Sequence, residues 1–167
     1  MRAQASPGAR RAAGLPELPG LPVALQFMQL LWAVAHGLET TSKRMKRGIG
    51  VTGPQRLVLR VVGLAPGLSA GQLAAVLHVH PSTLTGIIQR LAAHRLITRR
   101  RAAGDRRRAV LRLTPKGAVV NAADHGTVEA AIGTALSGAT ARDRAAARRV
   151  LERLARQLSA GAPPAAG

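Results

Sequence analysis

The feature that most constrains this chain is the spacing of apolar residues from Ser69 to Leu113. Two short runs carry apolar side chains at intervals of three and four residues, which is the pattern of buried helix faces. Few residues separate the runs, so the two helices must cross at a tight turn, and the small Ala74 allows close approach. The predicted inward positions are Leu73, Ala74, Leu77, Val79, Leu84, Ile87, Ile88 and Leu91.

The ends of both predicted helices carry capping residues. Ser69 followed by Gln72 is the pattern of a capping box for the first helix. Pro81 suits the first position of the second helix, where its missing N–H costs nothing. In the turn between them, His78 must adopt a left-handed or strained backbone, a conformation in which His is more common than most residues. The segment therefore predicts a helix-turn-helix.

The second helix of this pair presents hydroxyls, an amide and a guanidinium on its outer face. Such groups can donate to and accept from base edges and phosphates in a major groove. An ordinary solvated helix face has a similar composition without any function, so the face alone does not decide between the two interpretations. The residues concerned are Ser82, Thr83, Thr85, Gly86, Gln89 and Arg90.

A hairpin rich in arginine follows the second helix. The segments 96–101 and 107–113 mix β-branched and apolar residues with arginine, and residues 102–106 between them supply the turn. A helix-turn-helix followed by such a hairpin is a winged helix. We therefore expect a mainly α fold with a small β-hairpin wing.

These segments resemble the MarR family of bacterial transcription regulators (multiple antibiotic resistance regulators) in order and spacing. The resemblance extends from about Gly50 to Asn121 and is only architectural in the flanking helices. It departs from the family at His80, where a Ser-like cap is common, and at Gly86, where many relatives have a larger polar residue. The residues that carry it are Val51 to Gln55, Gln72 to Ala74, Ser82 to Thr85, Arg90 and Leu91, Asp105 to Arg107, and Leu113 to Gly117.

The resemblance also implies roles for the hairpin. In the family the wing carries an Asp-x-Arg element, matched here by Asp105 and Arg107, whose arginine enters the minor groove while the acid orients it. Arg106 at the wing tip has phosphate within reach, and Arg101 is part of the same basic segment. The predicted partner is double-stranded DNA, which would be bound by these four residues and by the outer face of the second helix.

The distribution of charge supports this partner. The net charge is +18, and residues 40–112 hold fifteen Lys or Arg residues but a single acid, Asp105. Solvated faces usually mix the two signs, whereas a concentrated positive field serves a polyanion.

We interpret the flanking segments as parts that carry and pair the winged helix. Residues 23–47 predict a long helix that is uncharged and apolar almost all round as far as Leu38, so it needs cover on several sides. A membrane span would need ~20 apolar residues, more than this run provides. We therefore expect a homodimer and no membrane insertion. The predicted division is a flexible arm (1–22), an N-terminal dimerisation helix (23–47), a winged-helix domain (48–114), C-terminal dimerisation helices (115–160) and a disordered tail (161–167).

Three helices outside the helix-turn-helix are also predicted. A helix from Gln55 to Val62 should turn Leu57, Val58, Val61 and Val62 inward. A helix opened by Thr114 and Pro115 should run toward Gly133, with Gly126 as a weak point. A last helix should be capped by Thr140 and Asp143 and end near Ser159, with an apolar stripe at Ala147, Leu151, Leu154 and Leu158.

The sequence lacks the residues that several classes of function require. The chain contains no cysteine, so it has no disulfide, thiol nucleophile or Cys-based zinc site, and we expect a cytoplasmic protein that lies on the bacterial nucleoid when bound to DNA. His78, His80 and His94 suggest a metal, but no carboxylate or thiolate lies near them in sequence to complete a site. No carboxylate pair, nucleophile set or P-loop is visible. We expect neither an enzyme nor a cofactor.

A small-molecule effector is the remaining expectation. In the MarR family such ligands often bind between the dimerisation helices and the winged-helix lobe. This resemblance implies a cleft near Met28, Trp32 and His36, with Arg60 or His125 beside them, although Met28 and Trp32 could equally be core residues. The sequence thus predicts a homodimeric repressor of a pseudo-palindromic operator. The alternative is an architectural protein that coats DNA without sequence preference.

Overall fold

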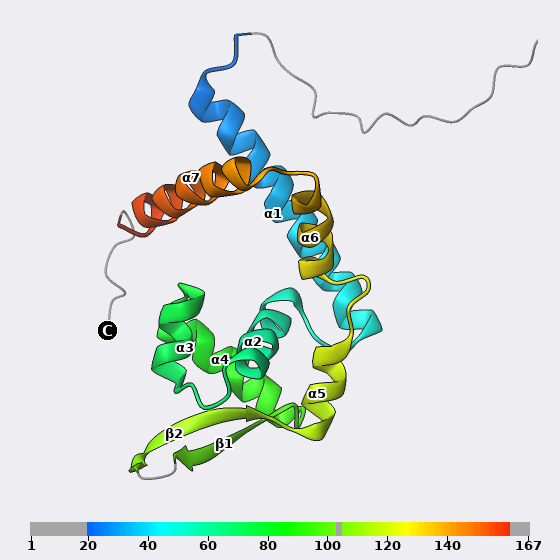
Figure 1. Ribbon diagram of the computed structural model, residues 1–167, viewed down its shortest axis with the longest axis vertical. Helices are drawn as coiled ribbons and strands as arrows, with labels where there is room; N and C mark the ends of the chain where they lie inside the picture. The colour runs from blue at the N-terminus through cyan, green and yellow to red at the C-terminus, as the bar shows by residue number, and fades with distance from the viewer. Residues whose placement is uncertain (1–19, 103–104, 161–167) are drawn as a thin grey trace, which may run out of the picture. The chain divides into compact units, whose positions relative to one another are not determined.

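The computed structural model describes residues 20–102 and 105–160, and it describes the side chains of these residues except those of 101–108. Most of the predicted arm and the whole predicted tail lie outside this part. The chain forms two units, Met1–His36 and Gly37–Gly167, which are considered separately. The elements are α1 (Val23–Gly48), α2 (Gly53–Leu64), α3 (Ala70–Leu77), α4 (Pro81–Ala93), β1 (Ile97–Ala102), β2 (Asp105–Leu113), α5 (Pro115–Ala122), α6 (Val128–Ser137) and α7 (Ala141–Ala160) (Figure 1).

The described residues are thus mainly helical, with a single two-stranded antiparallel sheet, as the sequence predicts. Helix α1 crosses the boundary between the two units. The part of it in the first unit exposes apolar side chains, including Phe27 (43% exposed) and Trp32 (69%). Across residues 20–102 and 105–160, no helix is long and apolar enough to cross a membrane.

The helix-turn-helix is formed by α3 and α4 as predicted. Ser69 Oγ accepts from Gln72 N, and the Gln72 side chain accepts from Ser69 N, which completes the capping box at the start of α3. His78 ends α3 in the left-handed region at φ 51°. Its N–H and that of Val79 bond back to carbonyls of the last turn, so the strained residue satisfies groups that the helix leaves open.

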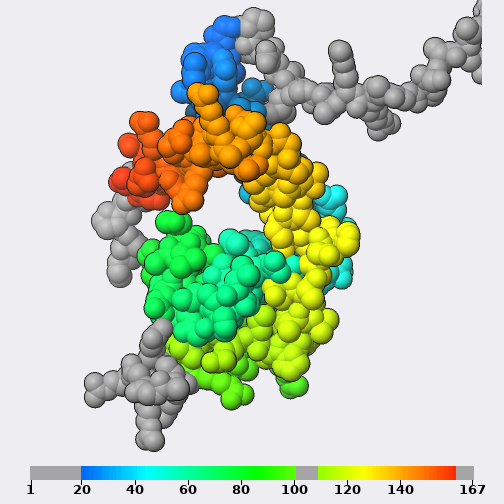
Figure 2. Space-filling view, in the orientation of Figure 1, coloured from blue at the N-terminus to red at the C-terminus, as the bar shows by residue number. Residues whose placement is uncertain are grey.

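The core of the second unit lies between α2, α3, α4 and the base of the hairpin. It contains most of the predicted inward positions of the helix-turn-helix, although Leu77 and Val79 are only partly buried. In the space-filling view these elements pack into one continuous body, coloured from cyan-green to yellow-green (Figure 2). The buried apolar residues are Val51, Val58, Leu59, Val62, Leu73, Ala74, Leu84, Ile87, Ile88, Leu91, Leu96, Ile97 and Leu111.

Helix α2 buries Val58 and Val62 as predicted and Val61 in part, but the predicted face is wrong at one position. The sequence predicts an inward Leu57, but this residue is 51% exposed, whereas Leu59 is fully buried. An apolar stripe with Leu57 and one with Leu59 both repeat at intervals of three and four residues, so the apolar pattern alone could not choose between the two stripes. The helix also begins two residues earlier than predicted. The Thr52 hydroxyl accepts from Gln55 N, and Thr52 N donates to the Gln55 side chain, which fixes the first turn.

The wing is longer and its connection shorter than the sequence predicts. Ile97 pairs with Leu113 and Arg101 with Ala109, and the register shifts between Arg101 and Ala102. The strands therefore include most of the predicted turn of residues 102–106. A pleated pair can extend through turn-forming residues when its ladder of hydrogen bonds continues, and propensity does not forbid this.

Gly117 ties the base of the wing to α5. A Cβ atom on Gly117 would lie 1.9 Å from Leu96 O, so only glycine fits at this contact. The same Leu96 carbonyl accepts from Thr114 N at 3.1 Å, and the Thr114 hydroxyl caps α5 by accepting from Gly117 N at 2.9 Å. The turn from β2 into α5 therefore holds the start of β1 through two contacts with the same Leu96 carbonyl.

The long helix predicted from Thr114 toward Gly133 is two helices, α5 and α6. The chain leaves the helical conformation at residues 123–127, where Gly126 has φ +67°. The sequence indicates a bend at Gly126, but α5 already ends at Ala122, because Ala123 adopts an extended conformation at ψ 126°. Thr127 then caps α6 by accepting from Ala130 N at 3.2 Å.

Helix α7 follows the predicted cap. Thr140 Oγ1 accepts from Asp143 N at 3.1 Å and donates to Asp143 Oδ2 at 2.7 Å. The hydrogen bonds that Thr140 Oγ1 and Thr140 N donate to Asp143 Oδ2 lower the pKa of Asp143. The apolar stripe of the helix is open in the single chain, since Leu151 is 56% and Leu158 is 71% exposed.

Candidate DNA-binding surface and effector cavity

The outer face of α4 carries the predicted polar residues. We call this set the reading face: Ser82, Thr83, Thr85, Gly86, Gln89 and Arg90. All are exposed except Gly86, which is half-buried. The opposite side of α4 is anchored by Leu84, Ile87, Ile88 and Leu91, all in the core. The reading face is therefore presented by a rigid helix, as a groove-binding surface requires.

His80 replaces a hydroxyl residue as the cap of α4. Its Nδ1 accepts from Ser82 N at 3.3 Å and lies 2.7 Å from Ser82 Oγ. Because the nitrogen that accepts from a backbone N–H carries no proton, the Ser82 hydroxyl donates to it as well. His80, which departs from the family pattern, therefore still caps α4, and its ring nitrogen uses the hydroxyl proton of Ser82.

The hydroxyl proton of Thr85 is also used in a hydrogen bond within the protein. Its Oγ1 donates to Pro81 O at 2.8 Å, so the oxygen remains only as an acceptor toward a ligand. Gln89 lies one helical turn further on the same side, ~6 Å along the axis. Its amide carries both a donor and an acceptor, which is the combination that bonds adenine bidentately.

Gly86 has no packing requirement. The nearest atom to a Cβ at this position would be Arg90 Nη2 at 3.6 Å, which is ordinary van der Waals contact. Glycine inside a helix costs ~1 kcal/mol relative to alanine. The missing side chain leaves the backbone of α4 open in the middle of the reading face.

Basic residues surround the base of the wing. We call them the wing base: Arg95, Arg99, Arg100, Arg112 and Lys116, all exposed. Arg95 adopts φ 57°, and its N–H bonds to Ala92 O while Leu96 N bonds to Leu91 O, which ends α4 and starts the wing. Lys116 Nζ donates to His94 O at 3.3 Å. The prediction did not single out these residues, although the charge count of residues 40–112 included the four arginines.

The structure describes the predicted residues of the wing tip by their backbones alone. The backbones of Arg101, Asp105, Arg106 and Arg107 belong to β1 and β2, but their side chains are outside the described residues. Their roles at the minor groove and at phosphate therefore stay predictions.

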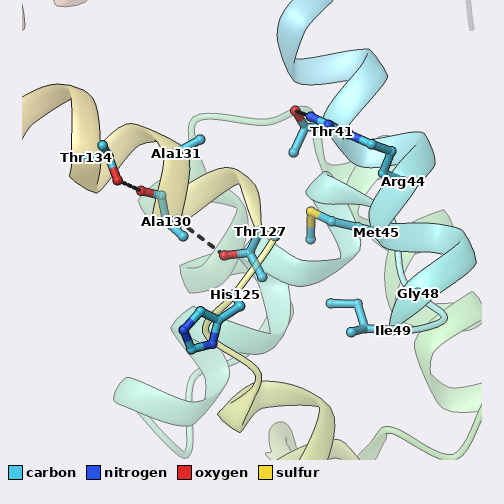
Figure 3. Close-up of a pocket in the computed structure, with 11 residues that line it drawn as sticks. Thr41, Arg44, Met45, Gly48, Ile49, His125, Thr127, Ala130, Ala131 and Thr134 are labelled. Atoms are coloured by element: carbon cyan, nitrogen blue, oxygen red, sulfur yellow. Dashed lines mark hydrogen bonds between the residues drawn. The ribbon is translucent and has the colours of Figure 1, made fainter. Parts of the chain in front are cut away.

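A cavity of about 460 Å³ lies between the last turns of α1 and the beginning of α6. Figure 3 shows Met45 on α1 facing Thr127 across it, with Arg44 toward its rim. Arg44 Nη2 donates to Thr41 Oγ1 at 3.1 Å. The lining residues are Thr41, Arg44, Met45, Gly48, Ile49, His125, Gly126, Thr127, Ala130, Ala131 and Thr134.

This cavity differs from the predicted cleft. His125 lines it, but Met28, Trp32, His36 and Arg60 do not. The first three belong to the other unit of the chain, and Arg60 instead donates to Asn121 O at 3.2 Å. His125 is almost fully exposed and lies 2.5 Å from Asp124 Oδ1. Within the described residues, Arg44 is thus the lining cation that forms no ion pair with a carboxylate.

A helix-turn-helix with an arginine-rich wing and a polar reading face defines a winged-helix protein of the kind that binds nucleic acid. Residues 49–108 match the MarR family model, which covers α2 to α4 and most of the wing. The resemblance predicted from the sequence is therefore confirmed. Residues 49–108 are thus similar to the winged-helix domain of MarR-family transcription regulators.

Solved structures of the same fold agree. The DNA complex of S. aureus MepR is 19% identical with a TM-score of 0.65, covering 79% of this chain and 97% of that one. A MepR-like protein complexed with pseudoligands is 26% identical with a TM-score of 0.65, covering 82% and 97%. PcaV of Streptomyces coelicolor with its natural ligand is 22% identical with a TM-score of 0.65, covering 83% and 98%. No curated protein matches the sequence.

Proposed function

We propose that this protein is a homodimeric, sequence-specific repressor that binds a pseudo-palindromic duplex and is released by a small anionic effector. The observation that carries the proposal is the reading face. It combines uncharged hydrogen-bonding groups with a single arginine on a helix held by the core, while the wing base supplies the charge. Uncharged groups distinguish bases and cations hold phosphates, so this division of labour favours a sequence-specific protein over a nonspecific coat.

Dimerisation is supported by the apolar side chains that the single chain leaves open. Along α6 and α7, Ile132 is 48%, Leu136 42%, Leu151 56% and Leu158 71% exposed. Large open apolar patches mark protein interfaces. A two-fold dimer would present two reading faces to two half-sites one helical turn of DNA apart, which is the geometry of a palindromic operator.

The test of the DNA proposal is selection of bound sequences from random duplex DNA, followed by titration of the selected duplex and a scrambled one at physiological salt. We expect a preference for the selected duplex of ~10³ or more. A coating protein would enrich no sequence and would bind both duplexes alike. Placing the selected site over a reporter promoter then distinguishes a repressor, which lowers expression, from an activator.

The effector proposal rests on Arg44 and the apolar floor made by Met45, Ile49 and Ala130. One cation above apolar atoms suits a small organic anion. Two of the similar structures are complexes with a natural ligand or with pseudoligands, which supports such a search.

A panel of small carboxylates, screened for loss of DNA binding, tests the effector proposal. We expect Arg44→Met to abolish the response to any active carboxylate while DNA binding itself remains. Lys43→Met is the matched control, because Lys43 is the next residue along α1, is exposed and pairs with Glu39 at 2.7 Å outside the cavity. Equal loss of response in both variants would argue against this cavity.

A further inference from the structure

A buried arginine links the winged helix to the segment that leaves it. Arg56 on α2 is only 1% exposed. Its guanidinium donates to Val120 O and Ala123 O at the end of α5, and its Nε donates to Glu129 Oε1 at 2.6 Å. Carbonyls at the end of a helix lack partners within it, and an acid in the first turn of a helix lies at its positive end. One side chain therefore holds the end of α5 and the beginning of α6.

This part of the chain needs such a contact. The connection at residues 123–127 includes the left-handed Gly126 and has no helical hydrogen bonding of its own to fix its direction. Helix α5 packs on α2 and on β2, but within the described residues α6 has no packing of that extent on any element of the winged helix. Helix α1 faces α6 across the cavity, but the polar contacts at the first turn of α6 are the main link between α6 and the winged helix.

The contacts of Arg56 also connect to α4, the helix that carries the reading face. Helix α2 packs directly on α4, and Val58, Leu59 and Val62 belong to the same core as Leu84 and Leu91. A guanidinium fixed on α2 is therefore fixed relative to the reading face.

Stability alone does not explain a buried guanidinium that is paired with a partly exposed carboxylate at this place. Replacing such pairs with apolar residues of similar volume is often neutral or stabilising, because desolvation offsets the attraction. A planar guanidinium that donates to three acceptors in fixed directions nevertheless defines geometry in a way that apolar contacts cannot. The arrangement is better explained by a need for one orientation.

We propose that Arg56, through Glu129 and the α5 carbonyls, is the positioning residue that sets the direction of α6 relative to α4. If the protein is the dimeric DNA-binding regulator proposed above, this direction fixes the separation of the two reading faces. Arg56 then determines which spacing between operator half-sites the dimer accepts.

The first experiment measures the direction without DNA. Because the chain has no cysteine, spin labels can be attached to Ala75→Cys on α3 and Ser137→Cys at the end of α6, with unlabelled protein added in excess. Double electron–electron resonance should give a narrow distance distribution in the parent and a broader one in Arg56→Met and in Glu129→Gln. Glu129→Gln leaves the core intact and decides the matter if Arg56→Met fails to fold. Unchanged narrow distributions would overturn the proposal.

The matched control is Arg60→Met. Arg60 lies one turn along α2, so its replacement removes the same charge, but it reaches Glu129 only at 4.0 Å and donates to a single α5 carbonyl, Asn121 O, at 3.2 Å. We expect its distance distribution to be much narrower than that of Arg56→Met. Broadening equal to that of Arg56→Met would show that general loss of charge on α2, and not the buried contact, controls α6, and would contradict the proposal.

The second experiment varies the duplex. Adding two base pairs between half-sites rotates one by ~70°, and we expect the parent to lose about tenfold or more in affinity. Glu129→Gln should lose much less on this change while binding a single half-site as the parent does. An unchanged spacing preference would overturn the role in spacing. If the parent prefers no paired half-sites at all, the proposed function fails, and the resonance measurement still decides the role of Arg56.

Discussion

Gly117→Ala should be among the most damaging small substitutions in the chain. The new methyl carbon would lie 1.9 Å from Leu96 O and 2.9 Å from Leu96 C, and both are backbone atoms that no side-chain rotation can move aside. Either α5 or the start of the wing must therefore shift.

The cost can be worked out from the interactions that this shift breaks. Leu96 O accepts from Thr114 N at 3.1 Å, the Thr114 hydroxyl donates to the neighbouring Arg95 O at 2.7 Å, and each hydrogen bond contributes ~0.5 to 1.5 kcal/mol. Overpacking of a tight contact adds ~1 to 3 kcal/mol. The helix propensity of alanine returns ~1 kcal/mol. We expect a net loss of ~1 to 5 kcal/mol in the free energy of unfolding, which follows from combining these terms.

Urea unfolding followed by circular dichroism measures this loss at fixed protein concentration. The midpoint should fall while the slope stays the same, since the surface exposed on unfolding hardly changes. Gly71→Ala is the control: nothing lies within 4 Å of a Cβ there, and the residue is helical, so this variant should be equal to the parent or more stable by up to ~1 kcal/mol. If Gly117→Ala unfolded at the same urea concentration as Gly71→Ala, the close contact and the reasoning built on it would be refuted.

Two further predictions concern acid and assembly. Burial alone would raise the pKa of Glu129, but hydrogen bonds from Arg56 and Thr127 and the charge of Arg56 lower it below its usual value. Since the unfolded chain then binds the proton more tightly, the stabilisation by Glu129 is present above its unfolded pKa and is lost as pH falls through the folded value. Thermal melts of the parent and Glu129→Gln should therefore differ at neutral pH and converge in acid; a gap that widened in acid would contradict the ion pair. In the second prediction, Leu151→Asp with Leu154→Asp should give monomers or aggregates by light scattering, because charge would replace the apolar stripe of α7. A folded, DNA-binding monomer would overturn the proposed dimer.

The helix-turn-helix could be predicted from the sequence because several signals agreed there. Apolar spacing, the Ser69 cap, Pro81 and the conformational demand at His78 all indicated the same two helices, and agreement across levels is what makes a local structure predictable. The exposed positions of Thr85 and Gln89 followed from the phase of the buried residues on α4.

Where the prediction failed, a single local signal had to choose between nearly equal alternatives. On α2, two apolar stripes competed, and tertiary packing selected the one with Leu59 over the one with Leu57. At Gly126, sequence could indicate weakness but not whether φ would become positive. The ion pair of the buried Arg56 with Glu129 joins residues 73 positions apart, and no periodicity reports contacts of that kind.

The separation of base reading from backbone binding is the central claim, and titration of three variants against operator and scrambled duplex at several salt concentrations tests it most directly. Gln89→Ala should change base preference, weakening binding by ~1 to 3 kcal/mol on the operator and little on the scrambled duplex. Arg106→Ala should weaken both duplexes alike and make the salt dependence shallower by about one unit for each phosphate that the variant no longer binds. Arg107→Ala should weaken binding most where the flank of the site is narrow and rich in A·T. Equal weakening on both duplexes for Gln89→Ala, together with an altered base preference for Arg106→Ala, would contradict the account.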